Sequence, residues 1–472
     1  MMQIFSMAKS RGDESYLAVL NREDLIKKIE NINPEVVAYG GCTGEHQIYV
    51  KENKKIKEKF GDQVFTIMGG PHATYFPEVI NEGTFDATCV GEGEYAFIEL
   101  LDQIEKGGDI SNINNIVPKG GKLNGVRPLV QNLDELPFPD RDLFYENRAD
   151  MSVKKIPSMN FITSRGCPYA CTYCLNHALR EMYKKQRFLR RRSVKNTIEE
   201  LVEAKEKFGI RFVKFVDDLF VTKDKDPWFN EFCEKYPREV GLPFLVYARF
   251  NLMTENMAKK LSKAGCQAAQ MSIESANERI RNKILKRGKM TEENIINGSK
   301  YCKDNGINII TYSMLGLPTS TIEDDIAAID LCIKANIPVP EFQIFHPLPK
   351  SEITEYCMEE GYLQENYFEK GKIEGFANSS VLNCFSEDEK SLQKNINLLG
   401  PLIVKYPKLR DLFINYLIHI PPNKIYKIIY VLDKQLTYPT KIYNSNISLK
   451  EKMKIIYKGL KLESFRKKKL YE

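Results

Sequence analysis

The chain has 472 residues, of which 43% are hydrophobic and 28% charged, and its formal net charge is +6. This composition is that of an ordinary globular protein of about three domains, and it excludes a disordered or fibrous chain. No apolar run reaches the ~18 residues of a spanning helix, the first residues lack a signal-peptide-like apolar stretch, and so mild a charge predicts no specific nucleic-acid partner. The eleven cysteines are scattered apart from one group, which favours a reducing cytoplasm over a disulfide framework.

The first section, residues 1–125, alternates short apolar runs with helical stretches. Apolar runs at 35–39, 64–68 and 87–90 each end at glycines, and helices are expected at 24–31 and 95–104. Strands that lead through glycine turns into helices predict an α/β fold with a parallel, doubly wound sheet. Ligands of such sheets bind at the carboxyl ends of the strands, where the glycine clusters fall.

The remaining chain divides into three further segments. Residues 126–155 are charged and broken by prolines, which predicts a linker. In 156–360 a helix is expected at 194–208, and six strands are expected at 160–163, 211–216, 244–248, 268–273, 308–315 and 341–345. Six strand–helix repeats predict a partial (β/α) barrel with its active residues at the strand ends. Residues 361–472 predict a helical region, with helices at 412–420 and 424–436.

One group of cysteines carries the clearest chemical signal. Cys167, Cys171 and Cys174 are spaced C-x3-C-x2-C, and Gly166 and Pro168 beside the first of them favour a loop. Three thiolates are one fewer than a cubane iron–sulfur cluster takes when it is fully ligated. An open metal position lets a substrate bind the metal. The residues alone therefore predict a three-ligand site for a soft metal.

The cysteine loop closely resembles that of the radical S-adenosylmethionine (SAM) superfamily. The resemblance implies a [4Fe-4S] cluster whose fourth iron binds the amino and carboxylate groups of SAM. It also implies reductive cleavage of SAM to a 5′-deoxyadenosyl radical, a six-stranded partial barrel, and an electron donor such as flavodoxin or ferredoxin.

Seven residues of the barrel section match positions that contact SAM in this family. They are Tyr173, Asp217, Asp218, Arg249, Glu274, Arg287 and Gly316. The resemblance places Tyr173 near adenine, Glu274 at the ribose or amino group, and a glycine turn at Gly316 beside adenine. An arginine suits the SAM carboxylate because its guanidinium binds a carboxylate with two hydrogen bonds. Adjacent strand residues point to opposite faces, so at most one of the two aspartates should face inward, and the sequence leaves open which.

The glycine clusters of the first section resemble the cobalamin-binding domain that precedes the radical domain in one large radical SAM class. The expected cobalamin contacts are Gly41, Thr43, Gly69, Gly70, His72, Thr74, Gly91, Glu92 and Gly93. Glycine lets the backbone approach a flat, bulky ligand closely. Two features depart from the pattern: the D-x-H-x-x-G segment that supplies a histidine to cobalt is absent, and so are the strand and helix usual at the domain's start. A degenerate sheet that serves as a scaffold is the alternative.

Taken together, the chain resembles the group of the anaerobic magnesium-protoporphyrin ester cyclase and the class B radical SAM methyltransferases. That resemblance implies methylation, or radical rearrangement or cyclisation, at an unactivated carbon of a small-molecule or natural-product substrate. One alternative is a radical SAM enzyme without cobalamin, such as a methylthiotransferase. Those enzymes carry a second set of three cysteines in the N-terminal domain, whereas the first section of this chain has only two cysteines, Cys42 and Cys89. A non-catalytic iron–sulfur electron carrier is another alternative, although a carrier needs neither an open iron nor a barrel.

Two basic stretches remain outside these motifs. Residues 187–192 predict a solvated face or a contact to an anionic substrate. Residues 450–469 predict a charged amphipathic helix, with weak contact to an anionic membrane surface as the alternative.

Overall fold

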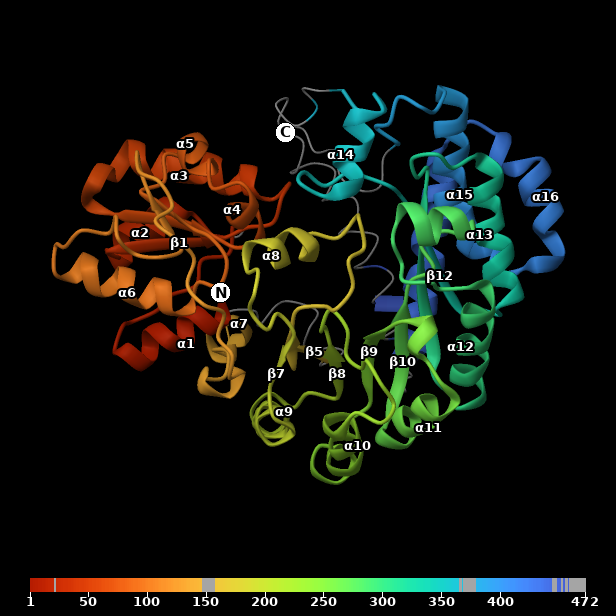
Figure 1. The fold of residues 1–472 in the computed structure, drawn as a ribbon, viewed down its shortest axis with the longest axis horizontal. Helices are drawn as coiled ribbons and strands as arrows, with labels where there is room; N and C mark the ends of the chain where they lie inside the picture. Colours follow the sequence, from red (N-terminus) through yellow and green to blue (C-terminus); the bar gives the residue numbers. More distant parts are fainter. Residues whose placement is uncertain are drawn as a thin grey trace. The chain divides into compact units, whose positions relative to one another are not determined.

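The computed structural model describes residues 1–20, 23–146, 158–364, 367, 379–443, 448–450, 453–454 and 457. Their contacts form two compact units: one holds the described residues up to 146 together with 179–190, and the other holds the rest. Figure 1 follows the chain through both units, coloured along the sequence. Nowhere in the described ranges does a helix have both the length and the apolar character needed to cross a membrane.

The first unit is built on a four-stranded sheet in the order β1-β2-β3-β4. Strands β1 (Val36–Gly40), β2 (Phe65–Gly69) and β3 (Ala87–Cys89) are parallel, as predicted, and β4 (Ile116–Pro118) runs antiparallel to β3. The sequence does not predict β4 because three residues are too few to show an alternating pattern. The helices of this unit are α1 (Met2–Arg11), α2 (Leu25–Ile32), α3 (His46–Phe60), α4 (Pro71–Tyr75), α5 (Val79–Gly83), α6 (Glu94–Glu105) and α7 (Arg141–Glu146).

Helices cover both faces of this sheet (Figure 1). Met68 of β2 lies in a core cluster with residues of α2, α3 and α5, whereas its neighbour Ile67 lies in a second cluster with residues of α6. Successive strand residues point to opposite faces, so one apolar strand supplies both cores. This is the doubly wound arrangement that the sequence predicts. Helix α1 was not predicted, although Gly12, with φ 107°, ends it in the usual way.

The second unit is built on a six-stranded parallel sheet in the order β12-β11-β10-β9-β8-β5. The strands are β5 (Ser158–Phe161), β8 (Phe212–Phe215), β9 (Phe244–Ala248), β10 (Cys266–Met271), β11 (Asn308–Leu315) and β12 (Val339–Ile344). All six lie at or within two residues of the predicted strands, and the order is that of a partial barrel. Two further strands, β6 (Ser164–Arg165) and β7 (Arg190–Arg191), have two residues each.

Helices follow the strands and surround the outer face of the sheet (Figure 1). They are α9 (Val194–Phe208), α10 (Pro227–Glu239), α11 (Glu255–Ala264), α12 (Glu292–Asp304), α13 (Ile322–Lys334) and α15 (Glu387–Lys405). Helix α8 (Asn176–Met182) follows the cysteine loop, and α14 (Glu352–Glu359) packs beside that loop beyond the strand ends. On the outer face, Phe244 of β9 packs edge-on against Phe232 and Tyr236 of α10, with ring centroids 5.8 and 5.0 Å apart. These aromatic contacts fix α10 on the sheet.

The C-terminal helices reach the inner face of the same sheet. Helix α16 (Arg410–Asn415) leads to α17 (Lys424–Thr437) and the π-helical turn η8 (Tyr438–Ile442), whose Ile442 joins the core cluster formed by inward-facing residues of β8 to β12. Buried Glu341 of β12 accepts hydrogen bonds from the hydroxyls of Tyr430 (3.1 Å) and Tyr438 (2.9 Å). The C-terminal chain therefore fills part of the barrel interior.

The helix predicted at 424–436 is confirmed, whereas 412–420 is a helix followed by a 3-10 turn, η7 (Leu417–His419). Most of the helix predicted at 450–469 lies outside the described residues.

Candidate active site

The cysteine loop begins directly after β5 and is held there by Asp217. This carboxylate lies just beyond β8, and its Oδ1 accepts hydrogen bonds from the backbone N–H of Thr163 (2.9 Å), the hydroxyl of Thr163 (2.9 Å) and the hydroxyl of Ser164 (2.6 Å). Burial raises the pKa of Asp217, and the hydrogen bonds from Ser164 and Thr163 oppose that rise. Asp217 thus positions the start of the cysteine loop.

Its neighbour Asp218 faces the cysteines. Loss of hydration raises the pKa of Asp218, against hydrogen bonds from the side chain of Asn176 and the backbone of Gly166. Its charge also helps to raise the pKa values of Cys167 and Cys174. The two aspartates therefore point to different surroundings, which answers the question that the sequence leaves open.

These different roles predict different results when each aspartate is replaced by asparagine. Asp217→Asn should lower the free energy of unfolding by about 1–3 kcal/mol, because three hydrogen bonds lose their charged acceptor. Asp218→Asn should change it by less than ~0.5 kcal/mol and weaken SAM binding instead. Denaturant unfolding and SAM titration of both variants measure these effects, and equal destabilisation by the two would contradict the assignment.

The three cysteines of the loop differ in burial. Cys171 is buried, and Cys167 and Cys174 are half-buried. Burial, with smaller contributions from Cys171 and Asp218, raises the pKa of Cys174 to about 11. The guanidinium of Arg249 lies beside Cys171, with Nη1 3.8 Å from Sγ. A positive ion or cluster is therefore what would turn these thiols into thiolates.

The three cysteines offer one kind of soft donor from a single short loop. In a cubane each cysteine binds a different iron, so the sulfurs stand further apart than around a single metal. The soft donor set from one loop fits a [4Fe-4S] cluster.

Three of the predicted SAM contacts meet next to the third cysteine. The Tyr173 hydroxyl donates to Glu274 Oε1 (2.8 Å) and accepts from Arg287 Nη1 (2.7 Å), and the same guanidinium nitrogen lies 3.5 Å from Glu274 Oε1. Arg287 Nη2 also donates to the carbonyl of Ser272 (2.7 Å). Burial and the Glu274 carboxylate raise the pKa of Tyr173 well above its usual value, so its hydroxyl keeps its proton. A buried, charged and hydrogen-bonded group is thus assembled beside the cysteine loop.

Glu274 is held in an uncommon backbone conformation. Its φ is 66°, in the left-handed region that non-glycine residues seldom adopt. Its N–H donates to Tyr312 O (3.1 Å), and its carbonyl accepts from Met314 N (2.8 Å), so β11 holds the residue on both sides. Strain of this kind persists where the surroundings hold the residue firmly, and it is typical of binding sites.

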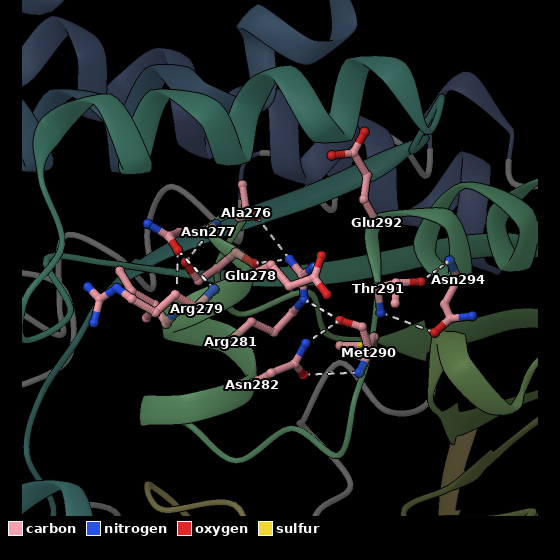
Figure 2. A network of polar contacts seen from close by, with 12 residues as sticks. Ala276, Asn277, Glu278, Arg279, Arg281, Asn282, Met290, Thr291, Glu292 and Asn294 are labelled. Atoms are coloured by element: carbon pink, nitrogen blue, oxygen red, sulfur yellow. Dashed lines mark hydrogen bonds and ion pairs between the residues drawn. The ribbon is translucent and has the colours of Figure 1, made fainter.

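The loop that joins Glu274 to Arg287 is organised around one buried arginine (Figure 2). Arg281 is fully buried; its Nε donates to Met290 O (2.8 Å), and its Nη1 donates to Ser275 O (2.7 Å) and Ala276 O (3.1 Å). The carbonyl of Arg281 in turn accepts from the N–H of Arg287 (3.0 Å). Arg281 therefore ties the start and the end of the loop together, and it fixes the separation of Glu274 and Arg287.

The same loop supports the cysteines. It contains a π-helical turn, η5 (Ile280–Ile284), and the carbonyls of Ile284 and Leu285 accept hydrogen bonds from the hydroxyl (2.8 Å) and N–H (3.3 Å) of Thr172. Sequence analysis missed Arg281 and Thr172 because a π-turn has no apolar periodicity. The cluster of arginine and asparagine between 277 and 282 is the only signal it leaves in the sequence.

Arg249 and Gly316 also have partners within the protein. The Arg249 guanidinium lies over the ring of Tyr169, 3.6 Å from its centroid, and donates to the carbonyl of Arg287. The N–H of Gly316 lies 3.2 Å from both carboxylate oxygens of Asp325. Arg249 thus links the loop of Tyr169 to that of Arg287, and Gly316 is anchored at the end of β11.

In the first unit, the three glycine loops meet at one edge of the sheet. Gly41 N–H donates to Gly69 O (3.1 Å), and His72 N–H donates to Gly41 O (3.0 Å). Gly70 has φ 90°, and a Cβ there would lie 3.0 Å from the backbone of Gly41. The Thr74 hydroxyl joins the third loop by accepting from Gly91 N–H (3.0 Å). The glycines thus allow the loops to pack closely at the carboxyl ends of the strands.

Two of the expected cobalamin contacts have partners of the protein's own. Glu92 accepts two hydrogen bonds of 2.9 Å from buried Arg190 and one of 3.1 Å from Val130 N–H. A Cβ on Gly91 would overlap the hydroxyl of Tyr183. Arg190 is therefore a structural partner of Glu92, and the prediction that the basic run at 187–192 is a solvated or substrate-contacting face is wrong for this residue.

A pair of stacked histidines lies beside the first two glycine loops. The rings of His46 and His72 stack with centroids 3.6 Å apart, and Thr43 Oγ1 lies 3.1 Å from His72 Nδ1. His46 Nδ1 accepts from Gly44 N–H (3.1 Å), which puts the ring proton on Nε2, and burial lowers its pKa. The glycine loops and the two stacked imidazoles thus gather at the carboxyl ends of the strands, where sheets of this kind bind their ligands. Sequence analysis missed His46, which shows no metal-ligand spacing.

Comparison with known proteins agrees with this geometry. Residues 161–332 match the Radical SAM superfamily, and residues 3–101 match the B12 binding domain. The uncharacterized methyltransferase PH0819 of Pyrococcus horikoshii is 31% identical over 345 residues, 72% of each chain. The cytidylyl-2-hydroxyethylphosphonate methyltransferase of Streptomyces wedmorensis is 25% identical over 395 residues, 75% of this chain and 72% of the relative.

A solved structure shares the fold. The radical SAM methyltransferase TsrM from Kitasatospora setae, with cobalamin and a [4Fe-4S] cluster bound, superposes with a TM-score of 0.61 and 17% identity, covering 76% of this chain and 71% of TsrM. These matches agree with the three-cysteine loop, the six-stranded parallel sheet and the glycine-rich N-terminal sheet. The chain therefore belongs to the radical SAM superfamily, as an enzyme that joins a radical SAM domain to a B12-binding domain.

Proposed function

We propose that this radical SAM enzyme transfers a methyl group to an unactivated carbon of a small organic substrate, with a [4Fe-4S] cluster, SAM and cobalamin as its cofactors. The observation that carries the proposal is the hydrogen-bonded group of Tyr173, Glu274 and Arg287 directly beside the three-cysteine loop. The names of the relatives from P. horikoshii and S. wedmorensis favour methylation over rearrangement or cyclisation.

In this proposal the residues of the second unit have two roles, which are to hold the cluster and to bind SAM. Cys167, Cys171 and Cys174 would hold the cluster, which supplies the electron for reductive cleavage of SAM. Glu274 accepts hydrogen bonds and so suits a hydroxyl or ammonium donor, whereas Arg287 suits a carboxylate. Tyr173 bridges these two paired charges and would orient both. The electron itself would come from a low-potential donor such as flavodoxin or ferredoxin.

The first unit would bind cobalamin at the edge where its glycine loops meet. Gly41, Gly69 and Gly70 offer backbone without side chains there, and Thr43 and His72 lie alongside. The proton of His46 on Nε2 makes that ring a donor to the ligand's amide or phosphate periphery rather than a metal ligand. The partnered Glu92 would keep the third loop in place.

The test uses full-length protein reconstituted with iron, sulfide and hydroxocobalamin. With SAM carrying a deuterated methyl group, dithionite and a small-molecule extract of the host cells, we expect 5′-deoxyadenosine, S-adenosylhomocysteine and a product with a deuterated methyl group. 5′-Deoxyadenosine without a labelled product would favour rearrangement or cyclisation. Failure to retain corrinoid after gel filtration would favour the enzyme without cobalamin.

A further inference from the structure

The outward side of α17 carries a row of exposed apolar residues. Ile425, Ile428, Ile429 and Leu436 are between 38% and 65% exposed, and they follow one another at helical spacing on one face. The opposite face of the helix is buried through Tyr426 and Val431. Helix α17 is therefore apolar on two sides, of which the described residues cover only one.

The preceding helical segment, residues 409–420, also exposes apolar side chains. Leu409, Leu412, Tyr416 and Ile420 are between 45% and 67% exposed, whereas Ile414 is buried. Singly exposed apolar residues are ordinary, but this group together with the row on α17 marks a surface that binds something. Both helices contact α15 with their buried sides, so their outward rows do not serve the core.

The charge of this region tells which partner suits the rows. In the sequence, residues 424–472 contain thirteen Lys or Arg and four Asp or Glu, a net charge of +9, so the rest of the chain has a net charge of −3. In the described part of this stretch Lys424 and Lys441 are exposed, whereas Lys434 is paired with Glu341 at 2.9 Å and Asp433 with Lys405 at 2.6 Å. A second copy of the chain would bring the same positive charge against this one, whereas an anionic surface is attracted to it.

We propose that α17 and the helical segment before it bind the surface of an anionic lipid bilayer. Aliphatic side chains flanked by lysines lie in the boundary between headgroups and acyl chains, and each lysine near an anionic surface adds to the binding. The rows are aliphatic apart from Tyr416, whereas surfaces that bind single-stranded nucleic acid stack bases on aromatic side chains. Such binding would bring the enzyme to a lipid surface, independently of the reaction it catalyses.

The experiment is flotation of the full-length protein with vesicles of phosphatidylcholine containing about 30% phosphatidylserine, and with phosphatidylcholine vesicles alone. We expect binding to the anionic vesicles only, and weaker binding at high salt. The double variant Ile425→Ser/Ile428→Ser should bind at least roughly tenfold more weakly, because it removes two aliphatic side chains that would be buried in the bilayer surface. Leu123→Ser, which changes an exposed leucine in the first unit, is the matched control and should bind like the parent.

Each other outcome overturns the proposal. Equal vesicle binding by parent and double variant would show that the apolar row is not the contact. The parent protein could instead fail to bind vesicles and form dimers in analytical ultracentrifugation. If the double variant were then monomeric, the apolar row would be the contact to a second copy of the chain. Because the substituted side chains are exposed, an unchanged thermal transition should confirm that both variants fold.

Discussion

Cys171→Ala is expected to give a folded protein that retains no iron–sulfur cluster and releases no 5′-deoxyadenosine from SAM. Cys171 is the buried member of the three-cysteine loop and the one that Arg249 approaches. Two remaining thiolates leave two irons of a cubane without protein ligands, and iron should fall from about four per chain to background. Iron and sulfide analysis after anaerobic reconstitution, together with chromatography of the SAM products under dithionite, measures both effects.

The matched control is Cys384→Ala, which replaces an exposed cysteine distant in sequence from the loop. It should keep the full iron content and the full rate of SAM cleavage. If Cys171→Ala cleaved SAM as fast as this control, the three-cysteine loop would not hold the reactive cluster, and the proposed function would fall with it.

Arg281→Ala is expected to destabilise the second unit by about 2–5 kcal/mol, because a buried carbonyl left without its donor costs about 1–3 kcal/mol. The substitution removes the side-chain donor of the Ser275 and Ala276 carbonyls. The Met290 carbonyl loses one of its two donors and keeps the bond from Asn282 at 2.9 Å (Figure 2). It also frees the loop whose ends carry Glu274 and Arg287. Denaturant unfolding should therefore show the loss of stability, and SAM affinity should fall even under conditions where the variant is folded.

Arg279→Ala provides the comparison within the same loop. Arg279 is exposed and donates to the Thr319 hydroxyl at 3.0 Å, so its removal should cost less than ~0.5 kcal/mol and leave SAM affinity unchanged. Equal effects of the two substitutions would mean that Arg281 does not organise the loop. A destabilised Arg281→Ala variant with the parent's SAM affinity would separate stability from the positioning role.

Much of the fold could be predicted from local pattern. The strand at 244–248 and the helix at 194–208 have the bounds that the sequence predicts, because each apolar run is long enough to show its period and ends at glycine or a charged residue. Strand β4 and helix α1 were missed. The first is three residues long, and α1 has few buried residues to produce a pattern.

The candidate site divides in the same way. The three cysteines stand within eight residues, so their spacing alone predicts a shared site. Tyr173 and Glu274 are separated by 101 residues, so no local pattern in the sequence connects them. The resemblance to the family assigned both to SAM, and the structure places the Tyr173 hydroxyl 2.8 Å from the Glu274 carboxylate. For Glu92 the resemblance suggested a ligand contact, whereas the structure adds a partner, Arg190, that no short-range pattern could indicate.

By itself the sequence determined the three-cysteine pattern, most of the order of strands and helices, and the glycine turns, because each depends on residues close together in the chain. The tertiary structure decided which of two adjacent aspartates holds the cysteine loop, how Arg281 organises the loop between Glu274 and Arg287, and which side of α17 the described residues leave uncovered. Those features depend on burial and on partners brought together by folding, and burial is a property of the packed chain rather than of any local run of residues.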